Sequence, residues 1–260
     1  MQRRALVGSA QVRRPGLPLR VATSTTLVQL AASSRAGIRF QAKRERELDD
    51  ALFALAAKLP ASEGCVAVCR EFTGPRGIPD LLATTRYQQE LAARDEAAVP
   101  AITNRSEANV LAALPHGSHR TLPWVAEACG LSLLLAQERL RGLSRVGAVL
   151  MENGGYRRHP TLVPLGHTYA FEAKVADWGK GLEQALRYLT WADSASIVLL
   201  DPPKDLGRAS AQCQSLGVGL AVGDVWKVRP KLGKPNRGLR LAASEAWFRD
   251  FAPHKPSADA

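Results

Sequence analysis

The sequence predicts an α/β protein that carries a separate helical insert, and three observations support this prediction. Short apolar segments typical of buried strands alternate with segments of helical periodicity along most of the chain. Residues 104–163 interrupt this alternation with consecutive helical segments followed by a hairpin. The chain has 260 residues, of which 46% are hydrophobic and 23% charged, and no apolar run is long enough to span a membrane, so a globular protein is expected.

Before the insert, the sequence predicts a helix, two strands and a second helix. Residues 45–59 place leucines on one face at helical spacing, and Pro60 ends this helix. The apolar segments 65–72 and 78–84 are predicted as strands, because a turn rich in glycine and proline separates them. The alanine-rich stretch 86–103 is predicted to be helical in its first half.

After the insert, the sequence predicts two strand–helix units, a final strand and a short helical tail. Asp177 is expected to cap the first of these helices, since its side chain can accept hydrogen bonds from amides of the first turn. The predicted segments, in chain order, are the strand 167–175, the helix 178–192, the strand 194–200, the helix 206–216, the strand 219–228 and an amphipathic piece at 245–251. The α/β domain is therefore predicted to be split into residues 45–103 and 164–252.

Residues 104–163 resemble a winged helix-turn-helix domain. Thr121 and Ser132 are the expected N-caps of its second and third helices, and the hairpin turns at Asn153 and Gly154. The third helix begins after a Leu-Ser pair and continues with small and leucine residues at the spacing typical of recognition helices. The resemblance implies that this helix lies in the major groove of DNA, with the hairpin as the wing.

Most of the positive charge lies at the start of the chain. Of the net charge of +11, nine charges come from residues 1–44, which contain no acid. This arm lacks helical or strand periodicity and contains several prolines and glycines, so we expect it to be mostly disordered. It is either a source of non-specific phosphate contacts or an extension without a role. The rest of the chain is nearly neutral, so net charge alone gives little support to DNA binding by the folded body.

Three charged residues lie on predicted strands that are otherwise apolar. Asp80 belongs to the strand before the insert, and Glu172 and Lys174 belong to the strand after it. Glu172 and Lys174 are two positions apart, so their side chains share one face of the strand. A carboxylate and an ammonium on a buried strand cost several kcal/mol unless they are paired or bound to a metal. The set indicates a functional site or, alternatively, a salt bridge in an unrelated α/β domain.

Asp80, Glu172 and Lys174 resemble the motif of the PD-(D/E)XK nuclease superfamily, whose fold is a mixed sheet flanked by helices. The likeness is discontinuous and covers roughly residues 45–85 and 166–228. The two parts of the motif are far apart in the chain because the winged-helix insert lies between them, and an insertion at a surface hairpin leaves core strands able to pair.

Two further features fit this resemblance. The first helix begins with Glu45, as in archaeal Holliday-junction resolvases, and Gln184 and Tyr188 resemble the Gln-x-x-x-Tyr motif of RecB-type nucleases. The resemblance therefore implies Glu45 and Gln184 as additional catalytic residues. Tyr188 is expected to contact the DNA backbone, and packing of its helix on the sheet is the alternative.

The resemblance implies metal-dependent hydrolysis of phosphodiester bonds. The carboxylates of Asp80 and Glu172, with the carbonyl of Ala173, offer oxygen ligands suited to Mg²⁺ or Mn²⁺. The ammonium of Lys174 is expected to orient the attacking water or to neutralise the phosphate.

The insert offers two sets of candidate DNA-binding residues. Arg157 and Arg158 follow the turn of the wing and are predicted to contact phosphates. The third helix presents Gln137 and Arg141, but it also exposes two leucines, which are poor readers of bases. Exposed leucines favour packing on another protein surface, so a homodimer or a partner protein bound through the winged helix is the alternative.

The leading hypothesis is a Mg²⁺-dependent DNA nuclease of the bacterial cytoplasm, acting in DNA repair, recombination or defence. The four cysteines lack the paired spacing of a disulfide or zinc scaffold, and arginine outnumbers lysine as in GC-rich bacterial genes. A second hypothesis is a DNA-binding regulator whose nuclease fold is catalytically silent. A third is a partner-docking subunit of a larger DNA-processing complex. No membrane partner is expected.

Overall fold

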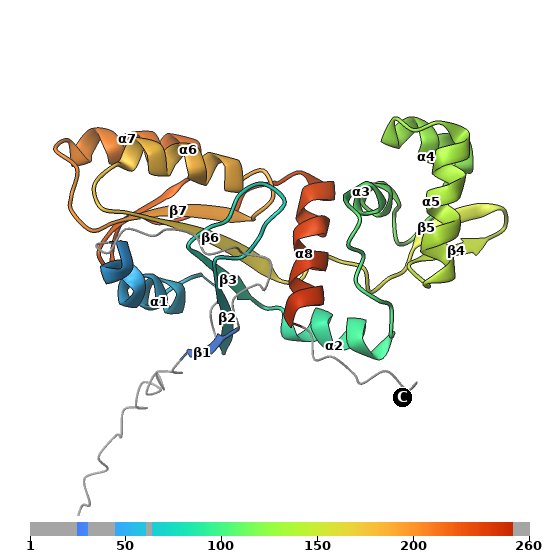
Figure 1. The fold of residues 1–260 in the computed structure, drawn as a ribbon, viewed down its shortest axis with the longest axis horizontal. Helices are drawn as coiled ribbons and strands as arrows, with labels where there is room; N and C mark the ends of the chain where they lie inside the picture. The colour runs from blue at the N-terminus through green and yellow to red at the C-terminus, as the bar shows by residue number, and fades with distance from the viewer. Residues whose placement is uncertain (1–24, 31–44, 61–63, 252–260) are drawn as a thin grey trace, which may run out of the picture.

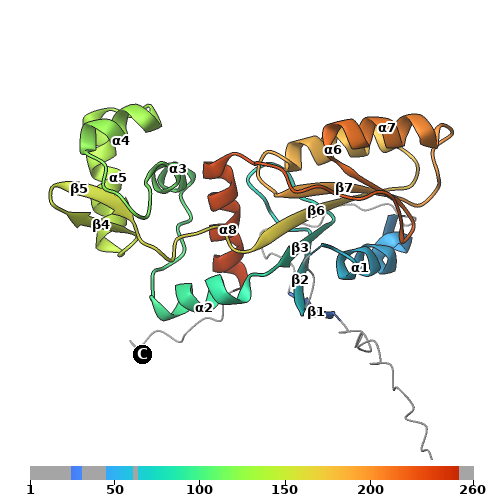
Figure 2. The ribbon, with the colours of Figure 1, turned by 180° about the vertical axis from the view of Figure 1, so that it is seen from behind.

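The structure, a computed structural model, describes residues 25–30, 45–60 and 64–251. These residues form one seven-stranded mixed sheet with helices on both faces, and a helical insert lies to one side of it (Figure 1, Figure 2). The α/β class predicted from the sequence is confirmed. In the described part of the chain, no helix combines the length and the apolar composition that crossing a bilayer requires.

The sheet has the strand order β1-β2-β3-β6-β7-β8-β9. Its strands are β1 (Thr26–Gln29), β2 (Cys65–Arg70), β3 (Leu81–Thr85), β6 (His167–Lys174), β7 (Ser194–Leu199), β8 (Gly219–Val222) and β9 (Val225–Val228). The pairs β2–β3 and β3–β6 are antiparallel, whereas β6–β7 and β7–β8 are parallel. The pairing of β3 with β6 brings the two halves of the chain together across the insert.

Helices cover both faces of the sheet (Figure 1). On one face, α1 (Asp49–Ala57) packs its buried leucines against Val66 and Phe171. On the other face, α6 (Trp178–Tyr188) and α7 (Leu206–Leu216) cover a larger core that contains Trp191 and Ile197. Each fully buried side chain of this size stabilises the fold by about 1.5–3 kcal/mol, so both faces of the central strands contribute.

The insert contains α3 (Arg105–Ala113), α4 (Leu122–Cys129), α5 (Leu133–Arg145) and the hairpin of β4 (Val149–Glu152) and β5 (Gly155–Arg158). Thr121 caps α4 by accepting a hydrogen bond from the backbone N–H of Trp124 at 3.4 Å, and Ser132 caps α5 in the same way at 3.3 Å. Asn153 and Gly154 have φ values of 52° and 73°, the left-handed region that two-residue hairpin turns need. The order of elements in the insert is as predicted.

The C-terminal helix α8 (Arg237–Phe251) lies between the sheet and the insert in both views (Figure 1, Figure 2). Leu241 packs in the core of the insert, whereas Leu239 and Trp247 pack in the core on the sheet. Glu245 of α8 is buried and accepts a hydrogen bond from Arg94 at 2.7 Å. One helix therefore contributes to both cores and holds the insert against the sheet.

Two sequence predictions about strands are wrong. Residues 26–29 belong to the arm that was expected to be disordered, yet they form β1 and pair in parallel with β2 at the edge of the sheet. The other residues of the arm, 1–24 and 31–44, lie outside the described residues. The single strand predicted at 219–228 is the hairpin β8–β9, because Gly223 adopts a φ of 56° and reverses the chain.

Three helix predictions also need correction. The short piece predicted at 245–251 is the C-terminal half of α8, whose buried polar residues hide its helical pattern. The helix predicted at 178–192 ends at Tyr188. The helix predicted at 45–59 begins as the 3₁₀ helix η1 (Glu45–Leu48) before α1.

Gly166 sets the path of the chain into β6. Its φ is +45°, and a Cβ at this position would overlap the backbone of Thr85 and Arg86 at the end of β3. We expect Gly166→Ala to lower the free energy of unfolding by about 2 kcal/mol, because both the left-handed conformation and the overlap oppose a side chain. Urea unfolding measures this loss. Gly217→Ala is the control, since Gly217 has a φ of +72° but open space around its Cβ position, and an equal loss in both variants would contradict the role of the close approach.

Candidate functional site

Asp80 and Glu172 are cross-strand neighbours at one end of the β3–β6 pairing. Leu81 pairs with Phe171, and the backbone N–H of Asp80 donates to the carbonyl of Phe171 at 3.0 Å. Asp80 thus contacts the residues on both sides of Glu172, since it donates to Phe171 and its side chain reaches Ala173. The carboxylate of Asp80 accepts a hydrogen bond from the N–H of Ala173 at 2.7 Å. Asp80 precedes β3 by one residue, which corrects its predicted place within the strand.

Glu172 and Lys174 form a short ion pair on the face of β6 that α6 covers. The ammonium of Lys174 lies 2.6 Å from Glu172 Oε1 and also donates to the carbonyl of Ala173 at 2.9 Å. The other carboxylate oxygen of Glu172 accepts a hydrogen bond from the hydroxyl of Tyr188 at 2.6 Å. Glu172 is fully buried, and Asp80 and Lys174 are each 8% exposed. Charge-assisted hydrogen bonds at these distances offset the cost of removing the charges from water.

The alternation of side chains along β6 explains why both charges meet the same helix. Glu172 and Lys174 face α6, whereas Ala173 between them packs in the core on the side of α1. Gly181 lets α6 approach this pair closely, because a Cβ there would lie 2.8 Å from Ile197 Cγ2 and 3.4 Å from Lys174 Cγ. A larger residue at position 181 would push the helix away from the ion pair.

Gln184 lies one helical turn before Tyr188, on the buried face of α6. Its Oε1 is buried and has no hydrogen-bond partner among the described residues. A buried acceptor without a partner costs about 1–3 kcal/mol, and a bound water or a donor group of a ligand would remove this cost. Gln184 is therefore placed to accept a hydrogen bond from a molecule that enters the site.

The oxygen atoms around Lys174 are of the kind that hard divalent cations prefer. Glu172 Oε1 and the carbonyl of Ala173 already bind the ammonium, so a positive charge lies between two of the expected ligands. Asp80 adds a second carboxylate, which is held beside Ala173 by its hydrogen bond. Oxygen donors of this kind suit Mg²⁺ or Mn²⁺. Within the described residues no group of three or more His, Cys, Asp and Glu side chains is arranged to hold a metal ion, so the expected ligand set is two carboxylates and one carbonyl.

No family model, curated protein or solved structure matches this chain. The function is therefore inferred from the arrangement of the side chains alone.

Of the residues implied by the sequence, the structure brings Asp80, Glu172 and Lys174 together. The side chain of Glu45, the first residue of η1, lies outside the described residues. Tyr188 does not lie where a contact with the DNA backbone would place it. It is 2% exposed, and its hydroxyl lies 3.0 Å from the carbonyl of Ile78 as well as against Glu172. The burial of Tyr188 agrees with the alternative, packing of helix α6 on the sheet. The hydrogen bond from Tyr188 to Glu172 was not predicted from the sequence.

The two candidate arginines of the wing have partners within the insert. Arg157 pairs with Glu152 of the same hairpin at 2.9 Å. Arg158, the next residue, instead donates to Nε2 of His116 at 2.6 Å. The hairpin of the insert and strand β6, which carries Glu172, lie on opposite sides of α8 (Figure 1), so these arginines do not contribute to the site itself.

The candidate residues of α5 lie at the surface. Arg141 is exposed and Gln137 is half-buried. Leu133 and Leu134, at the start of the same helix, are 54% and 77% exposed. The expected mixture of polar and apolar side chains on this surface is therefore present, and its partner is not identified by the structure.

Proposed function

We propose that this protein is a metal-dependent nuclease that hydrolyses phosphodiester bonds of DNA, with a PD-(D/E)XK core and an inserted winged helix-turn-helix. Its proposed setting is the bacterial cytoplasm, in DNA repair, recombination or defence. The observation that carries the proposal is that the carboxylate of Asp80 is bound to Ala173, next to Glu172, while the ammonium of Lys174 is bound between Glu172 and the carbonyl of Ala173.

The energetics of burial support a chemical role for this arrangement. Replacing a buried ion pair by apolar residues of similar volume is often neutral or stabilising, so stability alone does not favour Glu172 and Lys174 on this strand. The neighbouring positions of β6 on the same face, Ala170 and Thr168, are small and uncharged. Charges are concentrated at one end of the strand, where Asp80 joins them.

The chain's own residues would act as follows. A divalent cation, when bound, supplies a water of lowered pKa and positive charge beside the scissile phosphate. The carboxylates of Asp80 and Glu172 and the carbonyl of Ala173 would hold the cation. Tyr188 holds one oxygen of Glu172 and so fixes the orientation of that carboxylate. Lys174 would neutralise the charge that develops on the phosphate.

Gln184 and Glu45 are also proposed as catalytic residues. For Glu45 the proposal rests on the resemblance of the first helix to that of archaeal Holliday-junction resolvases. The unpaired Oε1 of Gln184 would accept a hydrogen bond from the attacking water and so help to orient it. In the proposed reaction the water oxygen bonds to phosphorus and the bond from phosphorus to the 3′ oxygen breaks. The water gives up one proton and the 3′ oxygen takes one up, so the products are a 5′-phosphate and a 3′-hydroxyl.

DNA binding is proposed for the insert. Arg157 and Arg158 of the wing would contact the phosphate backbone or the minor groove. Gln137 and Arg141 of α5 would face the major groove. The exposed leucines of α5 are proposed as the contact with a second copy of the chain or with another protein of a DNA-processing complex.

A second candidate function is DNA binding by a catalytically silent nuclease fold. The small exposed fractions of Asp80 and Lys174 favour it, because a phosphodiester must reach the ion pair before it can react. The two candidates differ in a single property, hydrolysis, and one experiment separates them.

With Mg²⁺ or Mn²⁺, the purified protein is expected to cut at least one of duplex, nicked, branched and single-stranded DNA. With Ca²⁺ it is expected to bind the same DNA without cutting, because Ca²⁺ accepts oxygen ligands in a looser geometry. Gel electrophoresis of end-labelled substrates measures both. Asp80→Asn, purified in parallel, controls for contaminating nucleases. If the wild type is as inert as this variant on all substrates with both metals, the nuclease proposal is wrong and the silent DNA-binding function replaces it.

A further inference from the structure

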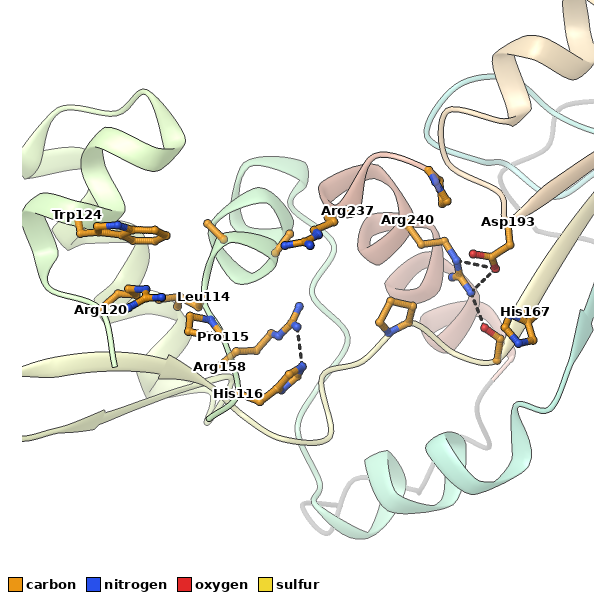
Figure 3. A pocket seen from close by; sticks show the side chains of 15 residues that line it. Leu114, Pro115, His116, Arg120, Trp124, Arg158, His167, Asp193, Arg237 and Arg240 are labelled. Carbon is orange, nitrogen blue, oxygen red and sulfur yellow. Dashed lines mark hydrogen bonds and ion pairs between the residues drawn. The ribbon is translucent and has the colours of Figure 1, made fainter. Parts of the chain in front are cut away.

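A pocket of about 720 Å³ lies between the insert and α8, away from the site around Glu172 (Figure 3). The end of α3 and the segment that follows it form one wall, and the start of α8 and the loop before β7 form the other. A cavity of this volume is in the range of sites that bind small molecules.

Cationic side chains from separate parts of the chain point into this pocket. Figure 3 shows Arg158 from β5 and Arg237 from α8 directed toward the same space, with Arg120 nearby. Within the described residues no carboxylate forms an ion pair with any of these arginines. Nε of Arg120 and Nε of Arg158 are both buried without a hydrogen-bond partner. Arginines without an ion-pair partner among the described residues thus line the pocket, and two of them also have a buried Nε without a hydrogen-bond partner.

The electrostatics of Arg158 indicate positive charge that is only partly offset. Burial, followed by the charge of Arg237, lowers the pKa of Arg158 to about 10, although the carboxylate of Glu245 acts in the opposite direction. Burial and then the charge of Arg158 lower the pKa of His116 below its ordinary value, so its imidazole is neutral and accepts the hydrogen bond from Arg158. A neutral histidine orients this guanidinium but does not neutralise it.

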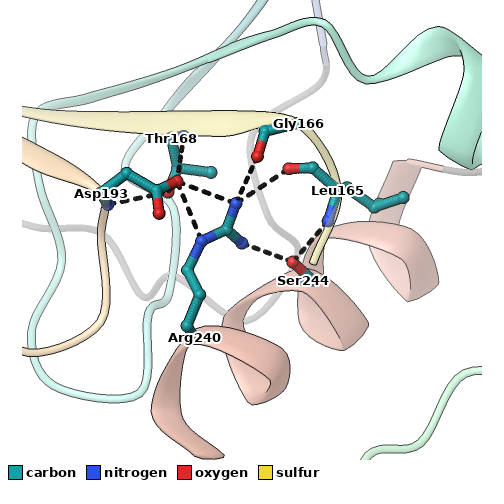
Figure 4. Close-up of polar contacts among 6 residues, drawn as sticks. All are labelled: Leu165, Gly166, Thr168, Asp193, Arg240 and Ser244. Atoms are coloured by element: carbon teal, nitrogen blue, oxygen red, sulfur yellow. Dashed lines mark hydrogen bonds and ion pairs between the residues drawn. The ribbon is translucent and has the colours of Figure 1, made fainter. Parts of the chain in front are cut away.

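The acid that lines the pocket is already used. Asp193 lies 2.9 Å from both Nε and Nη2 of Arg240 and also accepts a hydrogen bond from the N–H of Thr168 (Figure 4). Arg240 has further partners in Ser244 and in the carbonyls of Leu165 and Gly166. This network is complete in itself and joins α8 to the start of β6. Its net charge is close to zero, so it does not balance Arg120, Arg158 and Arg237.

One side of the pocket offers an aromatic ring. Trp124 is 39% exposed, and the guanidinium of Arg120 lies over its ring at 4.9 Å from the centroid. A stacked arginine and tryptophan form a platform on which a nucleobase can pack. The pocket thus presents unpaired guanidinium groups at one end and a flat aromatic surface at the other.

We propose that this pocket is a second, separate site that binds a nucleotide unit, with its phosphate on Arg158 and Arg237 and its base against Trp124. Arginine matches phosphate because its donors form paired hydrogen bonds with two phosphate oxygens. A free nucleotide and a nucleotide within a DNA strand share this chemistry. The site shares Arg158 with the DNA contacts proposed for the wing, but it goes beyond the proposed nuclease function because it requires neither a metal nor hydrolysis.

Calorimetric titrations in EDTA test this site with four probes: inorganic phosphate, deoxyadenosine, its 5′-monophosphate and a short single-stranded oligodeoxynucleotide. The monophosphate or the oligonucleotide is expected to bind, and deoxyadenosine is expected to bind at least about tenfold more weakly, since it lacks the charged acceptor. Arg237→Gln removes an exposed side chain and so preserves the fold, and it should weaken binding by about tenfold. Arg208→Gln, which removes an exposed arginine from α7, is the matched control and should bind as the wild type does.

Two further variants identify the source of the phosphate and the role of the ring. If the wild type binds the monophosphate and Arg237→Gln and Arg158→Gln do not, the site takes a free nucleotide. If the variants lose only the binding of the oligonucleotide, the site takes a nucleotide within a strand. The slope of the logarithm of the affinity against that of the salt concentration should then fall in magnitude by about 0.7, for one missing phosphate contact. Trp124→Ala should weaken binding of the nucleotide or strand more than binding of inorganic phosphate. The titrations contain EDTA and no metal, so their outcome does not depend on the nuclease proposal. If Arg237→Gln binds every probe as tightly as Arg208→Gln does, the proposed site does not exist.

Discussion

Replacing Lys174 by methionine is expected to lower DNA cleavage by about 10³-fold while leaving the affinity for Mn²⁺ unchanged or higher. The ammonium lies 2.6 Å from Glu172 Oε1 and 2.9 Å from the carbonyl of Ala173, two of the three proposed ligands. It therefore competes with a metal for these oxygens, and its removal relieves that competition. Cleavage falls because methionine fills a similar volume but carries no charge to offset that of the phosphate. Single-turnover cleavage and calorimetric titration with Mn²⁺ measure the two effects.

Asp80→Asn gives the contrasting result that makes Lys174→Met interpretable. It removes a ligand charge, so both Mn²⁺ binding and cleavage should be lost. Lys58→Met is the matched control, because Lys58 is exposed and pairs with Asp224 far from the site, and both properties should stay as in the wild type. If Lys174→Met cuts DNA at the wild-type rate, Lys174 has no catalytic role. If it loses Mn²⁺ to the same extent as Asp80→Asn, its ammonium supports the metal site instead of competing with it.

Stability measurements on the same variants check this competition independently of activity. Without metal, Lys174→Met leaves the buried carboxylate of Glu172 without its ammonium partner, and the protein should unfold more readily. A bound cation replaces the missing charge. Mn²⁺ should therefore raise the melting temperature of Lys174→Met more than that of the wild type, because a ligand that binds only the folded state stabilises it.

Features encoded by neighbouring residues could be predicted from the sequence. The caps Thr121 and Ser132 and the turn at Asn153 and Gly154 depend on side chains and backbone angles within a few residues, and the structure contains all of them. The shared face of Glu172 and Lys174 follows from the period of a strand in the same way.

Features that depend on distant partners could not be predicted. The helical pattern of α8 is hidden because its polar residues Arg240 and Glu245 are buried, and their partners Asp193 and Arg94 are far away in the chain. Strand β1 consists of four residues without a distinctive pattern, and it forms because the edge of β2 is available for pairing.

At the candidate site, too, positions within one element were predicted from the sequence, whereas contacts between elements were not. The spacing of Gln184 and Tyr188 predicted a shared helix face, but the contact of Tyr188 with Glu172 depends on how closely α6 packs on β6. That approach depends on Gly181, whose role is visible only in three dimensions. The pocket around Arg158 and Arg237 was missed for a related reason, since its walls come from separate parts of the chain.

Removing one partner of the buried pair Arg94 and Glu245 is expected to destabilise the junction between the sheet and the insert strongly. Glu245 Oε2 accepts hydrogen bonds from Arg94 at 2.7 Å and from the N–H of Ile102 at 2.8 Å, and Arg94 also donates to the carbonyl of Val99. These contacts tie α2 (Gln88–Glu96) and the segment leading into α3 to the helix α8. Glu245→Ala should lower the free energy of unfolding by about 3–5 kcal/mol, because it leaves the Arg94 guanidinium buried without its counter-charge.

The pair itself is expected to add little beyond what an apolar contact would supply. Burial raises the pKa of Glu245 despite the opposing effect of Arg94, and burial likewise lowers the pKa of Arg94, so desolvation outweighs the attraction at both groups. The double variant Arg94→Met, Glu245→Leu should therefore be more stable than Glu245→Ala, with a remaining loss of about 1–3 kcal/mol from the unpaired N–H of Ile102. Urea unfolding of Arg94→Met, Glu245→Leu and the double variant measures the coupling. Asp224→Ala, at an exposed ion pair, should unfold as the wild type does. Additive losses in the double variant would mean that Arg94 and Glu245 stabilise the junction independently, through their separate contacts with the loop and with α8.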